Sequence, residues 1–270
     1  MPSTTYAYVN GRFVPENQAV VSIADRGFLH GYGVFETMRV YGGKLFRASD
    51  HLARLASGMH HVGIVTFLTG SEIRAVCDVL IHRNAVTSGV ARVYATRDSL
   101  VATVQARVFE VKPRTAVFSS IMLDPTVSRF KTANRLPYIL AQREADQAMA
   151  DDAVLFNAAG NAVEFTTSNL FMLRDGTIIT PPLTDGPLPG ITRAVVTDLV
   201  RSMNIELRVE SIRKDRLLEA DELFATNSLM EIVPVTRLAR HEMGTGTAGR
   251  LLEAYRRIVR DELSLPSTSL

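Results

Sequence analysis

Hydrophobic and polar residues alternate at the start of the chain, and a period of two is typical of β-strands. Asn10 and Gly11 stand there between two short apolar runs, a pattern that predicts a β-hairpin. From Ser49, a candidate N-cap, apolar residues recur about every 3.6 positions, so we expect a helix, with a second one over residues 71–85. Two more strand-like runs follow. The first part of the chain is therefore expected to be an α+β domain.

The rest of the chain alternates helical and strand-like runs in the manner of an α/β domain. A helix is expected over residues 134–150, and a train of short strands separated by glycine-containing turns follows it. The loop PPLTDGPLPG leads into a helix that begins at Ile191, and a C-terminal helix begins near Gly249. We therefore expect two domains of the α+β or α/β class: a small N-terminal domain over residues 1–118, a linker over 119–125 and a large C-terminal domain over 126–270.

The composition limits the class of protein and its partners. Of the 270 residues, 46% are hydrophobic and 21% are charged, which is typical of globular domains with sizeable cores. With 30 basic and 28 acidic side chains the net charge is +2, so neither nucleic acid nor an anionic membrane is the default partner. The single cysteine, Cys77, excludes a disulfide framework, and the histidine spacing fits no helical zinc site. Without a long apolar run or a signal-peptide pattern, we expect a cytoplasmic protein that uses no metal.

One lysine stands out as a candidate nucleophile. The chain has four lysines, and Lys131 lies between Arg129 and Arg135, just after a predicted strand and just before a predicted helix. Nearby cations and partial burial both disfavour the charged ammonium, and a neutral lysine can attack carbonyl carbons. The alternative is an ordinary surface lysine, and the local sequence favours neither interpretation.

Two polar stretches are candidate anion sites. In LTDGPLPGITRAVV the glycines free the backbone, and Ile191 and Thr192 would present N–H groups and a hydroxyl at a helix N-terminus, where the dipole favours phosphate. Taken alone, such a loop is more often a plain connector in which Thr192 caps the helix. The second stretch places Thr226, Asn227 and Ser228 at the end of a predicted strand, where most such clusters are turns.

Several further charged residues are candidates for a site. Glu164 has apolar neighbours in a predicted strand, so it either faces solvent or meets a buried cation or a protonated ring nitrogen. Arg47, Arg92 and Arg97 lie at or near strand ends and could bind a phosphate or a carboxylate, although each alone is more often a surface arginine. His30 lies in RGFLHGYG, where it could line a cleft or have a structural role.

Taken in order, these signals resemble the class IV, or fold-type IV, pyridoxal-phosphate enzymes: branched-chain aminotransferases, D-amino acid aminotransferases and aminodeoxychorismate lyases. The matching blocks run from residue 25 to residue 235 with spacing like the family's: DRGFLHGYGVFETMRVYGGKLFRASDHLARL, FKTANRLPYILA, VEFTTSNLF, PPLTDGPLPGITR and ADELFATNSLMEIVPV. The resemblance implies a two-domain α/β fold with pyridoxal 5′-phosphate in the cleft between the domains. It also implies a homodimer in which a loop of the partner helps to close each site.

The resemblance also gives each candidate residue a role. Lys131 would form the Schiff base with pyridoxal 5′-phosphate and later carry the proton between the substrate Cα and the cofactor C4′. Glu164 would pair with the pyridine nitrogen and keep it protonated, so that the ring withdraws electrons from the carbanion. Four residues would bind the phosphate: Arg47, Ile191, Thr192 and Ser228. Three residues are the candidates for binding the substrate: His30, Arg92 and Arg97.

The chain departs from the patterns of the subfamilies at three places. The Arg-Gly-Tyr element of many lyases is absent after the strand of Arg92, and the Arg-x-His pair of D-amino acid enzymes is absent because Asp98 and Ser99 follow Arg97. Leu136 stands where branched-chain enzymes have a tyrosine, five residues after the lysine. A contact to the cofactor's phenolic oxygen is therefore missing or comes from another residue. Arg92 and Arg97 are five positions apart and would face opposite sides of a regular strand.

We therefore expect a transaminase that exchanges an amino group between an amino acid and a 2-oxo acid in two stages, through a pyridoxamine-phosphate form. D-amino acids and branched-chain L-amino acids are both candidate donors. The alternative is an aminodeoxychorismate lyase that forms 4-aminobenzoate and pyruvate for folate synthesis. Blocks such as FETMRV and NSLMEIVPV favour the lyase, whereas the missing Arg-Gly-Tyr element favours the transaminase. A non-catalytic protein that kept the fold is disfavoured because both Lys131 and Glu164 are present.

Overall fold

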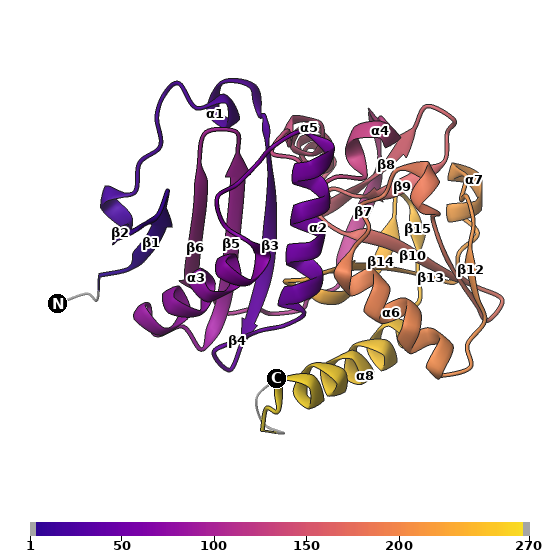
Figure 1. The fold of residues 1–270 in the computed structure, drawn as a ribbon. Coiled ribbons are helices and arrows are strands. Elements are labelled where there is room, and N and C mark those ends of the chain that lie inside the picture. Colours follow the sequence, from indigo (N-terminus) through magenta and orange to yellow (C-terminus); the bar gives the residue numbers. More distant parts are fainter. Residues whose placement is uncertain (1–3, 267–270) are drawn as a thin grey trace. The chain divides into compact units, whose positions relative to one another are not determined.

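The computed structural model describes residues 4–266 and divides into two compact units, each a mixture of helices and sheet (Figure 1). Of the described residues, the first unit comprises 4–109, 131–134 and 259–266. The second unit comprises Glu110–Phe130 and Arg135–Ile258. No helix within the described residues combines the length and the apolar character needed to cross a membrane.

The first unit is built on a six-stranded sheet with the strand order β2-β1-β6-β5-β3-β4. Its strands are β1 (Tyr6–Val9), β2 (Arg12–Pro15), β3 (Gly33–Tyr41), β4 (Lys44–Leu45), β5 (Ser88–Thr96) and β6 (Leu100–Ala106). The hairpin predicted at Asn10 and Gly11 joins β1 to β2, and both residues have the positive φ angles that a tight two-residue turn requires. All neighbouring strands are antiparallel, so residues opposite each other share a face of the sheet.

Two longer helices pack on this sheet, and their apolar residues share one core with β3 and β5 (Figure 1). They are α2 (Ala48–His61) and α3 (Gly70–Arg83), and the short helices η1 (Glu16–Gln18) and α1 (Arg26–His30) lie between β2 and β3. Thr69 begins α3 with a capping box in which its hydroxyl accepts from the backbone N–H of Glu72. The expected N-cap of α2, Ser49, is wrong: the N-cap is Arg47, whose backbone is left-handed (φ 52°).

The second unit is built on a nine-stranded sheet, part of which closes on itself. Strand β9 pairs with both β8 and β10, so β10, β13, β14, β7, β8 and β9 form a closed ring of strands. Glu164 and Asn169 are the opposite residues of the β9–β10 pairing that closes this ring. The strands are β7 (Arg114–Leu123), β8 (Asp152–Asn157), β9 (Ala162–Phe165), β10 (Asn169–Arg174), β11 (Thr177–Thr180), β12 (Leu207–Val209), β13 (Glu222–Asn227), β14 (Glu231–Leu238) and β15 (His241–Glu242).

The helices of the second unit connect and cover these strands. They are α4 (Pro125–Ser128), α5 (Leu136–Gln147), η2 (Leu183–Asp185), α6 (Ile191–Ser202), α7 (Lys214–Leu217) and α8 (Gly246–Leu263). Helix α5 buries Ala141 and Ala145 in a core shared with β8 and β9. Helix α8 begins in the second unit, and from Val259 its residues belong to the first unit.

The structure divides the chain at other positions than those expected from the pattern of elements. Residues 119–125, the expected linker, form the end of β7 and the start of α4, and β7 runs parallel to β8 and β14 within the second sheet. Residues 131–134 return to the first unit, where the carbonyl of Lys131 accepts from the N–H of Phe35 (N···O 2.9 Å). The strand at residues 119–123 and the return of residues 131–134 to the first unit both depend on pairing between distant segments. Local composition does not indicate such pairing.

Candidate active site

Lys131 is held at the edge of the first sheet by backbone pairing with β3. Thr132 forms an antiparallel bridge with Val34, next to the hydrogen bond between Lys131 and Phe35. The Nζ atom of Lys131 lies 4.6 Å from the centre of the Phe35 ring. Lys131 is half-buried and projects from the same face of the sheet as Phe35, a setting unlike that of a solvated surface lysine.

The face of the sheet that carries Lys131 also carries Arg92. Along β3, Phe35 and Thr37 project to the same side because side chains alternate in a strand. Thr37 lies opposite Arg92 on β5, and Phe35 lies opposite Tyr94, whose ring stacks on it with the centroids 5.1 Å apart. Lys131, the stacked aromatic pair and Arg92 therefore share one side of the sheet. Arg92 is half-buried, and its side chain forms no hydrogen bond or ion pair with another residue of 4–266.

The two other candidates for substrate binding lie at exposed positions of the first unit. Arg97 directly follows β5 and is exposed in the turn to β6. His30 is the last residue of α1 and is exposed as well. Within the described residues, neither side chain takes part in a hydrogen bond or an ion pair. Of the two arginines, Arg92 is the one that shares a sheet face with Lys131.

A buried charge cluster that the sequence pattern does not single out lies behind Phe35, on the opposite face of β3. Glu36 is fully buried, accepts from Arg54 Nε (2.7 Å) and Nη2 (2.8 Å), and lies 2.7 Å from His51 Nδ1. Burial alone would raise the pKa of Glu36, but the hydrogen bonds and charges of Arg54 and then of His51 lower it to about 2. The cluster links β3, which carries Glu36, to α2, which carries His51 and Arg54. Its one sequence signal is the spacing of His51 and Arg54, which puts them on one face of a helix.

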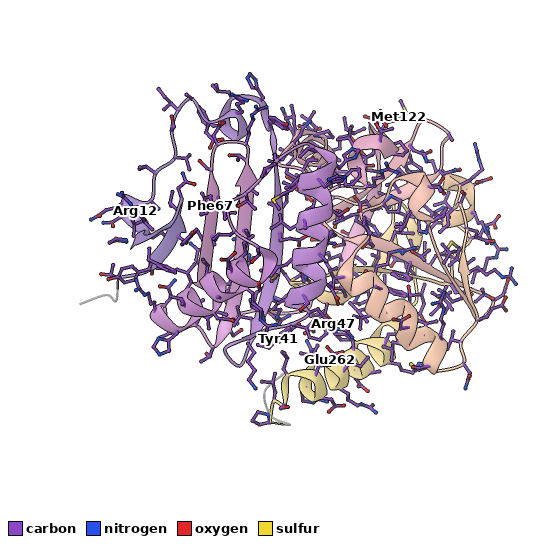
Figure 2. The ribbon with its side chains drawn as sticks, viewed as in Figure 1. Arg12, Tyr41, Arg47, Phe67, Met122 and Glu262 are labelled. Carbon is purple, nitrogen blue, oxygen red and sulfur yellow. The ribbon has the colours of Figure 1, made fainter. Side chains whose placement is uncertain are left out.

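Arg47 is held by two acids of the first unit. Its Nη1 donates to Asp50 (3.4 Å), and its Nη2 donates to Glu262 near the end of α8, a residue 215 positions away (Figure 2). The buried Nε of Arg47 has no hydrogen-bond partner among residues 4–266. The guanidinium therefore keeps one buried donor that an anion could satisfy.

Glu164 on β9 is buried and accepts three hydrogen bonds within the second unit. The hydroxyl of Tyr138 donates to Oε1 (3.0 Å), while Asn169 Nδ2 (3.2 Å) and the N–H of Leu188 (3.1 Å) donate to Oε2. The solvent-facing alternative for Glu164 is thus excluded. Tyr138 is a further residue that the sequence did not single out. Burial raises the pKa of Tyr138, and the charge of Glu164 raises it further, so the hydroxyl stays protonated.

The loop before α6 leaves the first turn of this helix without a side-chain cap. Gly190 is the N-cap residue, so Thr192, which is buried, does not cap the helix. A Cβ at Gly190 would lie 1.9 Å from Asn169 Oδ1, and only glycine fits so close an approach. The backbone donors of the first turn, at Ile191 and Thr192, and the helix dipole are therefore available to an anion.

The polar stretch after β13 contains a turn and a buried hydroxyl. Asn227 forms the turn, because its Oδ1 accepts from the N–H groups of Leu229 (2.9 Å) and Met230 (2.7 Å). Thr226 is buried, and in the described part of the chain its Oγ1 has no hydrogen-bond partner. Ser228 follows the strand and is half-buried. Thr226 is therefore a further candidate for anion binding, although the sequence pattern at this position is more typical of a turn.

The chain matches a known family over most of its length and several known proteins over nearly its whole length. The model of the amino-transferase class IV family matches residues 33–238. The D-alanine aminotransferase of Bacillus licheniformis is 30% identical over 259 residues, which cover 90% of this chain and 91% of that protein. The aminodeoxychorismate lyase of Bacillus subtilis (strain 168) is also 30% identical, over 276 residues that cover 95% of this chain and 94% of that protein.

Solved structures show the same fold. The branched-chain aminotransferase of Thermoproteus uzoniensis with norvaline has a TM-score of 0.89 at 27% identity, and 95% of each chain is covered. The branched-chain aminotransferase of Thermobaculum terrenum in its PLP-form (holo-form) has a TM-score of 0.86 at 27% identity, with 96% of this chain and 95% of that chain covered. These likenesses confirm the expected two-part α/β fold.

Proposed function

This chain belongs to the class IV aminotransferase family, and on that premise we propose that it is a transaminase that uses pyridoxal 5′-phosphate. It would transfer an amino group between an amino acid and a 2-oxo acid. The observation that carries the proposal is the position of Lys131 over Phe35, on the sheet face that also holds Arg92. A lysine nucleophile and an arginine on one face suit a substrate with an amine or carbonyl beside a carboxylate.

The residues present fit a pyridine ring that carries a phosphate. Lys131 would hold the ring covalently, and Glu164 would pair with its nitrogen. Each unit has a buried donor without a hydrogen-bond partner among residues 4–266: Arg47 Nε in the first unit and Thr226 Oγ1 in the second. Each of these donors by itself suits an acceptor oxygen of a phosphate. The phosphate-binding residues would be Arg47, Ile191, Thr192, Thr226 and Ser228. The Thermobaculum structure, which is in a PLP form, supports the same cofactor here.

The residues of this chain divide the work of the reaction. When bound, the cofactor supplies an electron sink for the carbanion at the substrate Cα. Glu164, within its set of three donors, holds a proton at the ring nitrogen. The amine of Lys131 would carry a proton between the substrate Cα and the cofactor C4′. Arg92 binds the substrate carboxylate and so fixes which bond at Cα faces Lys131.

Arg92→Gln should weaken the use of amino acid donors while the cofactor stays bound. The variant loses a charged hydrogen-bond partner of the carboxylate, so KM for the donor should rise about 10- to 100-fold. Arg97→Gln removes the same charge at an exposed position and should stay within about twofold of wild type. Steady-state kinetics of the two variants side by side provide the comparison. A loss confined to Arg97→Gln would move the carboxylate site to the turn after β5.

The absorption spectrum of the cofactor-bound protein tests the reaction class. We expect one enantiomer among D-alanine, D-glutamate, L-leucine and L-glutamate, added separately, to remove the visible band and leave the pyridoxamine form. That outcome would establish amino transfer and the stereochemistry of the donor. The second candidate function is the lyase, supported by the 30% identity to the Bacillus subtilis lyase. No response to any amino acid, with pyruvate released from aminodeoxychorismate, would establish the lyase instead.

We further propose that the chain forms homodimers. In each unit, large apolar side chains are exposed near a helix: Val20, Ile23, Phe28 and Leu29 near α1, and Leu136 and Ile139 on α5. Clustered apolar side chains on a surface are typical of an interface between subunits. Sedimentation equilibrium should give twice the mass of the chain at micromolar concentration. A monomer under those conditions would contradict the proposal.

A further inference from the structure

The closure of the barrel positions the carboxylate of Glu164. Glu164 and Asn169 are opposite residues in the pairing that joins β9 to β10. Asn169 also reaches the loop before α6, because its Nδ2 donates both to Glu164 Oε2 (3.2 Å) and to the carbonyl of Leu188 (2.8 Å). The N–H of Leu188 donates to the same Oε2 (3.1 Å). Oε2 of Glu164 therefore accepts from two donors. Strand pairing positions Asn169, and the other donor is the backbone N–H of Leu188.

The other oxygen, Oε1, accepts from the hydroxyl of Tyr138 (3.0 Å). Tyr138 lies in the first turn of α5, and the guanidinium of Arg135 lies 3.6 Å from the centre of its ring. Arg135 is anchored in turn, because its Nη2 donates to the carbonyl of Thr166 (2.7 Å). The phenol ring is therefore packed against a fixed cation. Since the pKa of Tyr138 is raised, its hydroxyl remains a donor across the physiological pH range.

Burial makes these hydrogen bonds decisive for the charge of Glu164. The exposed fractions are 8% for Tyr138, 5% for Glu164 and 5% for Asn169, so water does not replace a lost donor. A buried carboxylate with too few donors takes up a proton, whereas each donor favours the ionised form. A single hydrogen bond to a charged group changes such an equilibrium by about 10- to 100-fold.

We propose that Tyr138 is a positioning residue that keeps Glu164 ionised and aligned, and that it thereby tunes how firmly the ring nitrogen of the cofactor holds its proton. The inference rests on the proposed function, in which Glu164 pairs with that nitrogen. The phenol of Tyr138 is directed to the carboxylate, because its hydroxyl donates to Oε1. Without this hydroxyl Glu164 is a stronger base, and the shared proton moves from the ring nitrogen toward Glu164.

Tyr138→Phe tests the proposal, because it removes the hydroxyl and keeps the ring beside Arg135. We would measure the dissociation constants of the apoprotein for pyridoxal 5′-phosphate and for its 1-deaza analogue, which has carbon in place of the ring nitrogen. In the variant the ratio of the two constants should shift about tenfold in favour of the analogue. Tyr8→Phe removes the hydroxyl of another buried tyrosine, in β1, and should leave the ratio unchanged.

Each outcome of the experiment has one meaning. If Tyr138 merely supports the fold, Tyr138→Phe weakens both ligands equally and the unchanged ratio overturns the proposal. In a Glu164→Gln background, where no charge remains to stabilise, Tyr138→Phe should leave the ratio unchanged. A full shift in that background would also overturn the proposal. Failure of the wild-type protein to bind either ligand would contradict the proposed function instead.

Discussion

Lys131→Ala abolishes the visible absorbance of the cofactor-bound protein and all measurable amino transfer, while the protein stays soluble and folded. The three other lysines contact other groups: Lys44 the carbonyl of Leu263, Lys112 the carboxylate of Glu110 and Lys214 the ring of Phe118. Lys131 pairs with β3 through its backbone, so truncation of the side chain leaves the edge of the sheet intact. The absorption spectrum after removal of excess cofactor is the measurement.

The matched control for this experiment is Lys112→Ala, which removes an exposed lysine and should keep the visible band. Borohydride reduction of the wild-type protein, followed by peptide mapping, should place the cofactor's mass on the peptide that contains Lys131. A visible band that persists in Lys131→Ala, or a label on another lysine, would refute the assignment of the nucleophile.

Glu164→Ala slows amino transfer by about 100-fold or more, yet the cofactor remains attached to the protein. The size of the effect follows from the loss of a buried ionic partner, which typically costs about 3–5 kcal/mol, or a factor of about 150 to 5,000. The attachment should survive, because in the proposed site it depends on Lys131 and on the phosphate-binding candidates. Single-turnover kinetics with the preferred amino acid, together with the spectrum, separate the two effects.

Alanine at this position also removes an acceptor from Tyr138, Asn169 and Leu188, and each unsatisfied buried donor destabilises the fold by about 1–3 kcal/mol. Glu164→Gln keeps the shape of the side chain and removes the charge. Its amide oxygen can accept from Asn169 and Leu188, and its amide N–H can donate to the hydroxyl of Tyr138. It should therefore melt closer to the wild-type temperature than Glu164→Ala and still turn over slowly. Turnover near the wild-type rate in the glutamine variant would show that the ring nitrogen has another partner.

Elements with local signals could be predicted. The turn at Asn10 and Gly11 and the helix from Ile191 lie where expected, because turn and helix-start signals act over a few residues. The predicted N-cap of α2 is wrong, because Arg47 adopts the left-handed conformation. That conformation can be expected from sequence mainly at glycine or asparagine, and Arg47 is neither. The role of residues 119–125 as part of a strand was missed because the partners of β7 lie far along the chain.

The sequence by itself determined which side chains are available for chemistry: a lysine between two arginines, an acid in an apolar strand and a glycine-rich start of a helix. Only the tertiary structure decided which of them lie together. It put Arg92 on the face of Lys131, Tyr138 and Asn169 on the carboxylate of Glu164, and Glu262 on Arg47. The reason is that strand register and barrel closure select these neighbours. A shift of the strand register by one residue would move each side chain of that strand to the opposite face of its sheet. Register depends on partner strands that lie far along the chain, and a local pattern does not contain them.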